Sequence, residues 1–478
     1  MIDLASSTAT QVVAALRSGA VSSRELLTAM LERIDRWNPE LNAVVTLDRD
    51  RAFDAAGRAD DAIARSGPTG PLHGLPMTVK DAFETAGMRT TSGATEYGQH
   101  VPTQDAEPVR RLRAAGAIVF GKTNLPRLAG DWQTANDVFG TTRNPWDTSR
   151  VPGGSSGGSA AALASGMSLL ELGRDIGGSI RIPAHCCGVV GHKPTQGAVP
   201  MRGHIPGRPG SLAPGDLWVA GPMGRSVDDV ELGLDVLLHG GLDTAPGSLP
   251  TSPDHAARRP RVALHLDDPT CPVGAEVRRL LHAAAEALER AGAVIVEAPI
   301  PSLASTHPVY GRLMTAAMAD DDALRYARTV IESGRDAGDP SLRYANDVAM
   351  THLEWRTIDE ERHRIRALWA EHVFTVVDAV LAPVAPTPAF PHILGGHWSE
   401  RRLTIDGVER GYSDTMLPWA GLATLPGLPA TAVPIGFTTD GLPVGAQVLA
   451  ARWADRTCFA VARLLEVALG GFVAPPLA

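Results

Sequence analysis

The chain contains 478 residues, 44% of them apolar, and carries a formal net charge of -9 at neutral pH. This length allows a large buried core, arranged either in about three domains or in one large α/β unit. The negative charge argues against a general binder of nucleic acid or of anionic membranes, because both need a basic surface.

The cysteines and the N-terminal sequence favour a reducing compartment. Four cysteines, scattered along the chain, are too few for a disulfide framework. The first residues contain no basic segment followed by an apolar run, and no stretch approaches the roughly 18 apolar residues of a membrane span. The His and Cys spacings match neither HExxH nor CxxC. We therefore expect a cytoplasmic protein without a membrane anchor or a metal site.

The first 65 residues are predicted to be helical. In residues 22–34 one helical face is apolar, and Ser22 or Ser23 is placed to cap the helix. That face consists of Leu26, Leu27, Met30 and Ile34.

Two later segments alternate helix and strand. Residues 106–120 predict a short amphipathic helix, a stop at Gly116 and an apolar strand, and residues 276–300 repeat this order with a longer helix. Such alternation predicts an α/β protein with at least partly parallel strands. The Gly-, Pro- and Ser-rich residues 240–260 predict a surface excursion, either a domain boundary or an insertion in one domain.

Lysine is rare in this chain, which makes its position informative. Only three of the 44 basic residues are lysines: Lys80, Lys122 and Lys193. Arginine stays protonated inside proteins, whereas a buried lysine can lose its proton and act as a base. Lys80 is therefore a candidate general base, although chance or the compact shape of an ammonium group would also explain a retained lysine.

Two glycine- and serine-rich stretches follow, GGSSGGS at 153–159 and DIGGSIR at 175–181. Glycine lets several backbone N–H groups point into one space, which suits an anion or an oxyanion. The pattern lacks GxxxxGK[ST] and a GxGxxG after a strand, so a phosphate cradle is not supported. It matches the GxSxG nucleophile elbow twice, and the following SAAALASG predicts a helix that argues against a linker. Composition alone leaves these alternatives open.

The order of the motifs resembles the amidase signature family of serine hydrolases. The similarity covers TVKDAF around Lys80, GKTN at 121–124, both glycine- and serine-rich stretches, and LPGLPATAVPIGFTTDGLPVGAQ at 425–447. An α/β-hydrolase would explain neither DIGGSIR nor this order. The resemblance implies one domain over residues 1–478, with a central mixed, largely parallel β-sheet flanked by helices and an N-terminal helical segment at 1–65.

The resemblance also implies a catalytic triad without histidine. Ser179 is expected to be the nucleophile, Ser155 the bridging serine after a cis peptide bond, and Lys80 the base that draws the proton through Ser155. Backbone N–H groups of the loop before the nucleophile are expected to stabilise the tetrahedral oxyanion. Those groups belong to Ile176, Gly177, Gly178 and Ser179 itself.

Substrate contacts are harder to predict. We expect Trp132, Gly154 and Arg174 to contact the substrate, and Arg174 departs from the family, which usually carries Thr or Ser there. A long cation at this position would reshape the pocket floor, pair with Asp175 or point outward. Trp132 would be a wall against an acyl or aryl group, or simply packed.

The main functional prediction is a self-sufficient amidase acting on small linear amides, with anilides, carbamates or esters as further substrates. The alternative is a glutamine-dependent amidotransferase A-type subunit that needs partner chains. Those subunits usually read DTGGSIRQPA, so the apolar Ile176 and Ile182 favour the first prediction. The intact triad disfavours a non-catalytic binding protein.

For partners, we expect a small-molecule amide and water, no nucleic acid and no membrane, with no cofactor. A homodimer formed through the N-terminal helices is compatible with the resemblance.

Overall fold

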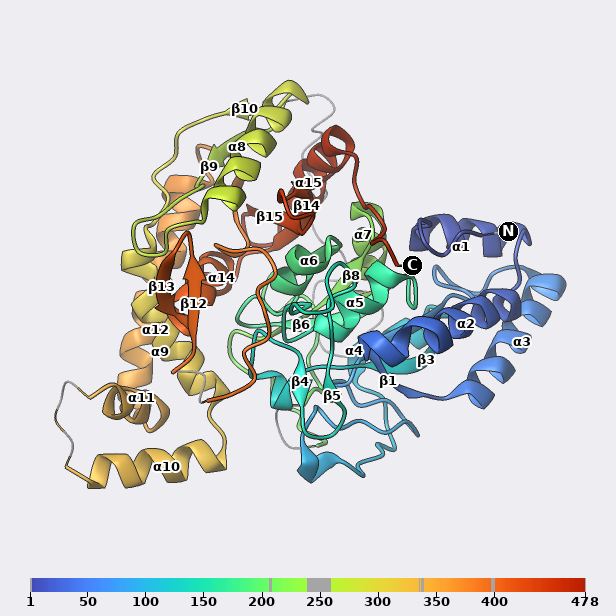
Figure 1. The fold of residues 1–478 in the computed structure, drawn as a ribbon, viewed down its shortest axis with the longest axis horizontal. Helices are drawn as coiled ribbons and strands as arrows, with labels where there is room; N and C mark the ends of the chain where they lie inside the picture. Colours follow the sequence, from blue (N-terminus) through green and yellow to red (C-terminus); the bar gives the residue numbers. More distant parts are fainter. Residues whose placement is uncertain are drawn as a thin grey trace.

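The computed structural model describes residues 2–205, 209–238, 259–334, 336, 339–396 and 400–477. One mixed sheet of 11 strands runs through the described chain in the order β1-β3-β2-β6-β8-β7-β14-β15-β11-β9-β10 (Figure 1). The predicted single α/β domain with a mixed central sheet flanked by helices is confirmed. The strands are β1 (Val44–Leu47), β2 (Pro76–Lys80), β3 (Ile118–Thr123), β6 (Glu171–Asp175), β7 (Val190–Lys193), β8 (Val219–Gly224), β9 (Arg261–Leu264), β10 (Val294–Ile295), β11 (Ala379–Pro383), β14 (Ala430–Phe437) and β15 (Pro443–Ala450).

Parallel pairing lies in two wings of this sheet. β2 is parallel to both β3 and β6 in one wing, and β9 is parallel to β10 and β11 in the other. The strands between the wings pair antiparallel, from β6 through β8, β7 and β14 to β15 and on to β11. Every residue of β2, β3, β6 and β8 is buried. Because these strands are covered on both faces, buried and exposed residues do not alternate along them, and the charged residues of β6 are buried with the rest.

Helices surround the sheet. α5 and α6 pack on its middle strands. α15 packs on α7, α8 and β14, while α7 also packs on β8 and α8 on β14. α1, α2 and α3 lie beside the β1 edge, and α9 to α12 lie at the other end of the molecule, where α10 and α11 extend from the body (Figure 1). The bounds are α1 (Ala9–Ser18), α2 (Ser23–Leu41), α3 (Arg49–Ser66), α4 (Glu107–Ala114), α5 (Gly157–Ser165), α6 (Arg181–Cys187), α7 (Val227–Leu238), α8 (Ala275–Arg290), α9 (Leu303–Met318), α10 (Asp321–Glu332), α11 (Pro340–Val348), α12 (His352–Leu368), α13 (Tyr412–Met416), α14 (Pro418–Thr424) and α15 (Asp455–Leu469).

Most local predictions are confirmed. Ser22 caps α2 through a capping box with Glu25, and the predicted apolar face is buried. The helix, glycine stop and strand predicted for 106–120 form α4, Gly116 at φ 94° and β3. After α8, by contrast, the strand β10 has only two residues.

Two predictions have other outcomes. The first 65 residues are not wholly helical, because Val44–Leu47 form an edge strand that pairs with β3 across a long stretch of sequence. The surface excursion predicted at 240–260 lies outside the described residues, except for its last two positions. None of the described helices is both long and apolar enough to cross a bilayer.

Candidate active site

Lys80 is the last residue of β2 and has no solvent exposure. Its Nζ is hydrogen-bonded to Ser155 Oγ at 2.6 Å and to Ser156 Oγ at 2.9 Å. Among the described residues, no carboxylate forms an ion pair with this nitrogen. The structure therefore brings the candidate base and the candidate bridging serine into direct contact.

The surroundings of Lys80 favour the neutral amine. Burial, reinforced by the positive charge of Arg174, holds the pKa of Lys80 well below its usual range, although Asp175 opposes the shift. A neutral amine can accept a proton from a hydroxyl group at hydrogen-bond distance. Lys80 is thus placed to act as a general base.

The segment before α5 packs tightly around the two serines. The peptide bond between Gly154 and Ser155 is cis. A Cβ atom at Gly154 would lie 2.6 Å from the Asp131 carbonyl oxygen, so only glycine fits between this backbone and the neighbouring loop. The Ser156 N–H donates to the Ser179 carbonyl oxygen at 3.1 Å, which places the two serine-rich segments side by side.

Ser156 is a site residue that sequence reasoning did not assign. Its hydroxyl contacts Lys80 almost as closely as that of Ser155 does. The double match to GxSxG, centred on both serines, was the signal that pointed to it. The structure alone leaves both hydroxyls available as proton acceptors or donors for the lysine.

Ser179 belongs to the Ser179 loop, residues 175–181, and is 4% exposed. Asp175 holds the shape of this loop by accepting backbone hydrogen bonds from Gly178 and Ile180, both at 3.0 Å. Arg181 adds two bonds from its guanidinium to the same carboxylate, at 2.9 and 3.1 Å. Although burial alone would raise it, the charge and hydrogen bonds of Arg181 lower the pKa of Asp175 to about 2.

The backbone N–H groups of this loop are not equivalent. The N–H of Gly178 is used by Asp175. Within the described part of the chain, the N–H groups of Ile176, Gly177 and Ser179 have no protein acceptor. These three remain candidate oxyanion donors, whereas Gly178 contributes its left-handed backbone, at φ 89°.

Trp132 lies against the Ser179 loop. Its indole Nε1 donates to the Gly177 carbonyl oxygen at 2.7 Å, and its ring packs edge to face on Tyr412 with centroids 5.3 Å apart. At the preceding residue of the loop, the hydroxyl of Tyr310 donates to the Ile176 carbonyl oxygen. Tyr310 was missed by sequence reasoning because it lies on α9, far away in the chain.

Arg174 points inward and is fully buried. Its guanidinium lies 4.7 Å from the centre of the Trp218 ring, and its Nη2 is 3.3 Å from Met318 Sδ. Its Nε has no hydrogen-bond partner among the described residues. Burial lowers the pKa of Arg174 to about 10. Of the three predicted alternatives, pairing with Asp175 does not occur, since Arg181 forms that ion pair.

The other two lysines stabilise backbone. Lys122 donates to the Phe83 carbonyl oxygen at 2.6 Å and lies 3.4 Å from Asp81. Lys193 donates to the Leu428 carbonyl oxygen at 2.7 Å. Among the described residues, neither lysine forms a hydrogen bond to Ser155, Ser156 or Ser179, so both are packed against backbone carbonyl groups outside the serine cluster.

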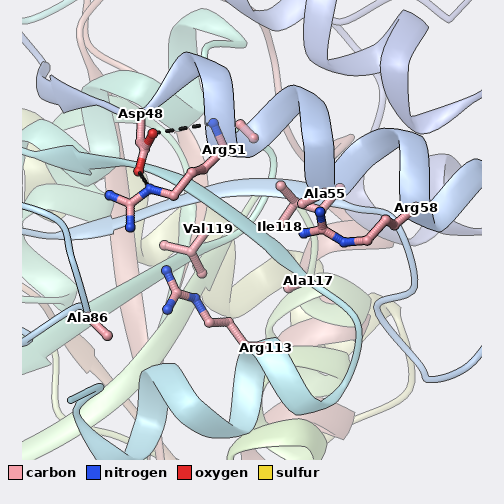
Figure 2. Close-up of a pocket in the computed structure, with 10 residues that line it drawn as sticks. Asp48, Arg51, Ala55, Arg58, Ala86, Arg113, Ala117, Ile118 and Val119 are labelled. Atoms are coloured by element: carbon pink, nitrogen blue, oxygen red, sulfur yellow. Dashed lines mark hydrogen bonds and ion pairs between the residues drawn. The ribbon is translucent and has the colours of Figure 1, made fainter. Parts of the chain in front are cut away.

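A cavity of about 300 Å³ lies away from the serines, between α3, the end of α4 and the start of β3 (Figure 2). Arg51, Arg58 and Arg113 surround it. Asp48 pairs with Arg51, and Asp105 pairs with Arg113 at 2.8 Å, so carboxylates already neutralise two of these cations. The cavity holds none of the residues proposed for amide chemistry.

Comparisons with known proteins agree on the family. The Amidase family pattern matches residues 25–459. A protein from Carboxydothermus hydrogenoformans, named as the A-type subunit of glutamyl-tRNA(Gln) amidotransferase, is 34% identical over 486 residues, covering 96% of each chain.

Solved structures are also similar. One described as an amidase has a TM-score of 0.79 and 32% identity, covering 97% of this chain and 100% of the other. The A-type subunit of glutamyl-tRNA(Gln) amidotransferase from Thermotoga maritima has a TM-score of 0.76 and 28% identity, covering 100% of this chain and 99% of the other.

These relatives contradict the prediction of a self-sufficient amidase whose only partners are a small amide and water, with no nucleic acid. Curated relatives at 33% to 35% identity are named as tRNA amidotransferase subunits. The wrong inference came from Ile176 and Ile182. Ile182 is fully buried beneath Gly178, and Ile176 is 3% exposed and belongs to the main apolar cluster. Their apolar side chains are therefore explained by packing in the core and do not indicate an apolar substrate.

The alternative prediction, an amidotransferase A-type subunit, is the one that these names support. Both predictions rest on the same amide chemistry, which the comparisons support in its coarse form. Because the match runs through nearly the whole chain and includes the motifs around Lys80 and Ser179, the chain belongs to the amidase signature family.

Proposed function

We propose that this chain is the amide-cleaving subunit of a glutamine-dependent amidotransferase and works together with partner chains. The observation that carries the proposal is the buried Lys80 amine at 2.6 Å from Ser155, next to the segment that holds Ser179. The relatives named as A-type subunits of glutamyl-tRNA(Gln) amidotransferase supply the likeness that points to a multi-chain enzyme acting on glutamyl-tRNA, and glutamine is our proposed ammonia donor.

The proposed chemistry begins with Ser179 Oγ attacking the amide carbon of the substrate. As the O–C bond forms, the proton of Ser179 passes to Ser155, and the proton of Ser155 passes to Lys80. The carbonyl oxygen becomes an oxyanion, and we assign its stabilisation to the N–H groups of Ile176, Gly177 and Ser179, which have no protein acceptor in the described chain. The relay then runs in reverse, the C–N bond breaks and ammonia leaves.

Hydrolysis of the acyl-enzyme completes the cycle. Water attacks the ester carbon, gives its proton to the Ser155 and Lys80 relay, and releases the acid as Ser179 regains its proton. In the proposed enzyme the ammonia is transferred to an acceptor bound by partner chains. Because its formal charge is -9, this chain by itself is expected to bind RNA weakly. We therefore assign most of the contacts with tRNA phosphates to those partners.

The test measures ammonia release from glutamine and amidation of glutamyl-tRNA. The chain is assayed alone and with the remaining subunits of the Carboxydothermus hydrogenoformans amidotransferase. We expect both activities in the mixture and their loss in Ser179→Ala, whereas Ser66→Ala, at an exposed serine on α3, keeps both. Absence of ammonia release from glutamine in the mixture would disprove the proposed function.

A further inference from the structure

Two aromatic side chains hold successive carbonyl groups in the Ser179 loop. The Tyr310 hydroxyl donates to the carbonyl oxygen of Ile176, and the Trp132 indole donates to that of Gly177 at 2.7 Å. Tyr310 comes from α9 and Trp132 from the loop after β3, so two distant parts of the chain meet on one short segment.

The orientation of a carbonyl group fixes the orientation of the next N–H group. In a planar trans peptide, the C=O of one residue and the N–H of the next point in opposite directions. Tyr310 therefore directs the N–H of Gly177, and Trp132 directs that of Gly178. The second part of this relationship is visible in the structure, since the Gly178 N–H points to Asp175 at 3.0 Å.

The N–H of Gly177 has no protein acceptor in the described chain, although its peptide plane is held in place. We propose that Tyr310 and Trp132 are positioning residues: Tyr310 holds this N–H ready for the oxyanion formed on attack by Ser179, and Trp132 fixes the next peptide of the loop, between Gly177 and Gly178. The proposal rests on the proposed function. It gives Trp132 a role in positioning the loop, in place of the substrate wall considered from the sequence.

Both donors are themselves well fixed. The Tyr310 ring is fully buried against Gly421, where an added Cβ would lie 2.5 Å from the ring. Burial raises the pKa of Tyr310, so its hydroxyl stays protonated and able to donate. Trp132 packs against Tyr412, whose hydroxyl is bonded to Asp131 at 2.7 Å. Rigid support of this kind is what a preformed oxyanion site needs.

The test uses Tyr310→Phe and Trp132→Phe, which keep an aromatic ring and remove the donor. The first readout is the rate at which an alkyl fluorophosphonate labels Ser179. In this reaction Ser179 Oγ bonds to phosphorus, fluoride leaves, the proton passes to Lys80, and the phosphoryl oxygen requires the oxyanion donors. We expect both variants to label about 10- to 100-fold more slowly, since small misplacements of reacting groups cost rates of this order.

The second readout separates positioning from substrate binding and from stability. With glutamine and the partner subunits, we expect kcat to fall by a similar factor while KM changes less than about twofold. The midpoint of thermal unfolding should stay close to that of the wild type. Tyr326→Phe, at a half-exposed tyrosine on α10, is the matched control and should behave as wild type.

The outcomes are distinguishable. If the wild-type chain is not labelled and releases no ammonia, the proposed function fails. If the wild type is labelled and both Phe variants are labelled equally fast, the positioning role is wrong. A raised KM with unchanged kcat in Trp132→Phe would also overturn it, in favour of a substrate wall. If Tyr310→Phe does not fold, Trp132→Phe decides.

Discussion

Lys80 Nζ lies 2.6 Å from Ser155 Oγ, and both side chains are fully buried. An ammonium ion in such a place would normally be paired with a carboxylate, because an unpaired buried charge is costly. Here the nitrogen contacts two hydroxyl groups and lies near the cation of Arg174. This arrangement stabilises the neutral amine, which is the form that a general base requires.

The first prediction concerns the identity of this base. Lys80→Arg is expected to lower the rate of amide cleavage by about 10²- to 10⁴-fold, and as much as Lys80→Ala does, because arginine keeps its proton. Fluorophosphonate labelling and ammonia release measure the effect, and circular dichroism verifies that each variant is folded. Substantial activity in Lys80→Arg would mean that proton acceptance by this side chain is not needed.

The second prediction concerns Arg174, at a position where the family usually carries Thr or Ser. Its positive charge helps to lower the pKa of Lys80. The rate should rise with pH as Lys80 loses its proton. Removing the charge in Arg174→Gln raises the pKa of Lys80. The acidic limb of the pH–rate profile should therefore move to higher pH, and the rate should reach its plateau at a higher pH than in the wild type.

Labelling rates across a pH series measure this shift. Arg58→Gln is the control, because Arg58 is an exposed arginine of α3 beside the distant cavity. Its acidic limb should coincide with that of the wild type. An unshifted limb in Arg174→Gln, or one that moves to lower pH, contradicts the electrostatic role.

The third prediction concerns the buried pair of Asp175 and Arg181. The pKa of Asp175 falls from 3.8 to about 2 on folding. The carboxylate therefore stabilises the fold above about pH 4, and this contribution, about 2–3 kcal/mol, is lost as pH falls through 2. Asp175→Asn should lose this pH dependence.

Removing the charge also leaves the guanidinium of Arg181 buried without its ion partner. We expect Asp175→Asn to lower the free energy of unfolding by about 3–5 kcal/mol near neutral pH, and to lower activity strongly because the Ser179 loop loses its support. Urea unfolding at several pH values measures the change. Asp35→Asn, in an exposed pair with Arg49, should cost less than about 1 kcal/mol. Near-normal activity in Asp175→Asn would mean that the pair does not hold the loop.

Sequence reasoning succeeded where a family motif or a short pattern carries the information. The proximity of Lys80 to Ser155 was implied by the family resemblance, and α4 followed from its periodicity and its glycine stop. It failed where the structure depends on contacts between distant residues that no sequence motif records. Tyr310 reaches the Ser179 loop across 134 positions, which no local pattern records. Ile182 was misread for a related reason, because its burial under Gly178 became visible only in three dimensions.

The last prediction separates backbone strain from packing at Gly178. Gly178 and Gly197 both have φ of 89°, a region that side chains rarely adopt. A Cβ at Gly178 would lie 2.7 Å from Ile182 Cδ1, whereas a Cβ at Gly197 would meet nothing within 4 Å. Gly197→Ala therefore carries the backbone cost alone, about 1–2 kcal/mol, and should keep full activity.

Gly178→Ala carries the same backbone cost and a steric overlap inside the loop that presents Ser179. We expect it to lose at least about 1 kcal/mol more than Gly197→Ala in urea unfolding, because a well-packed site tolerates added atoms poorly. We also expect fluorophosphonate labelling to fall by at least about tenfold, since a shift of this loop displaces both the nucleophile and the oxyanion donors. Equal stability and equal labelling in the two alanine variants would mean that the loop adapts to the added methyl group, and that its shape is not held by Ile182 beneath it.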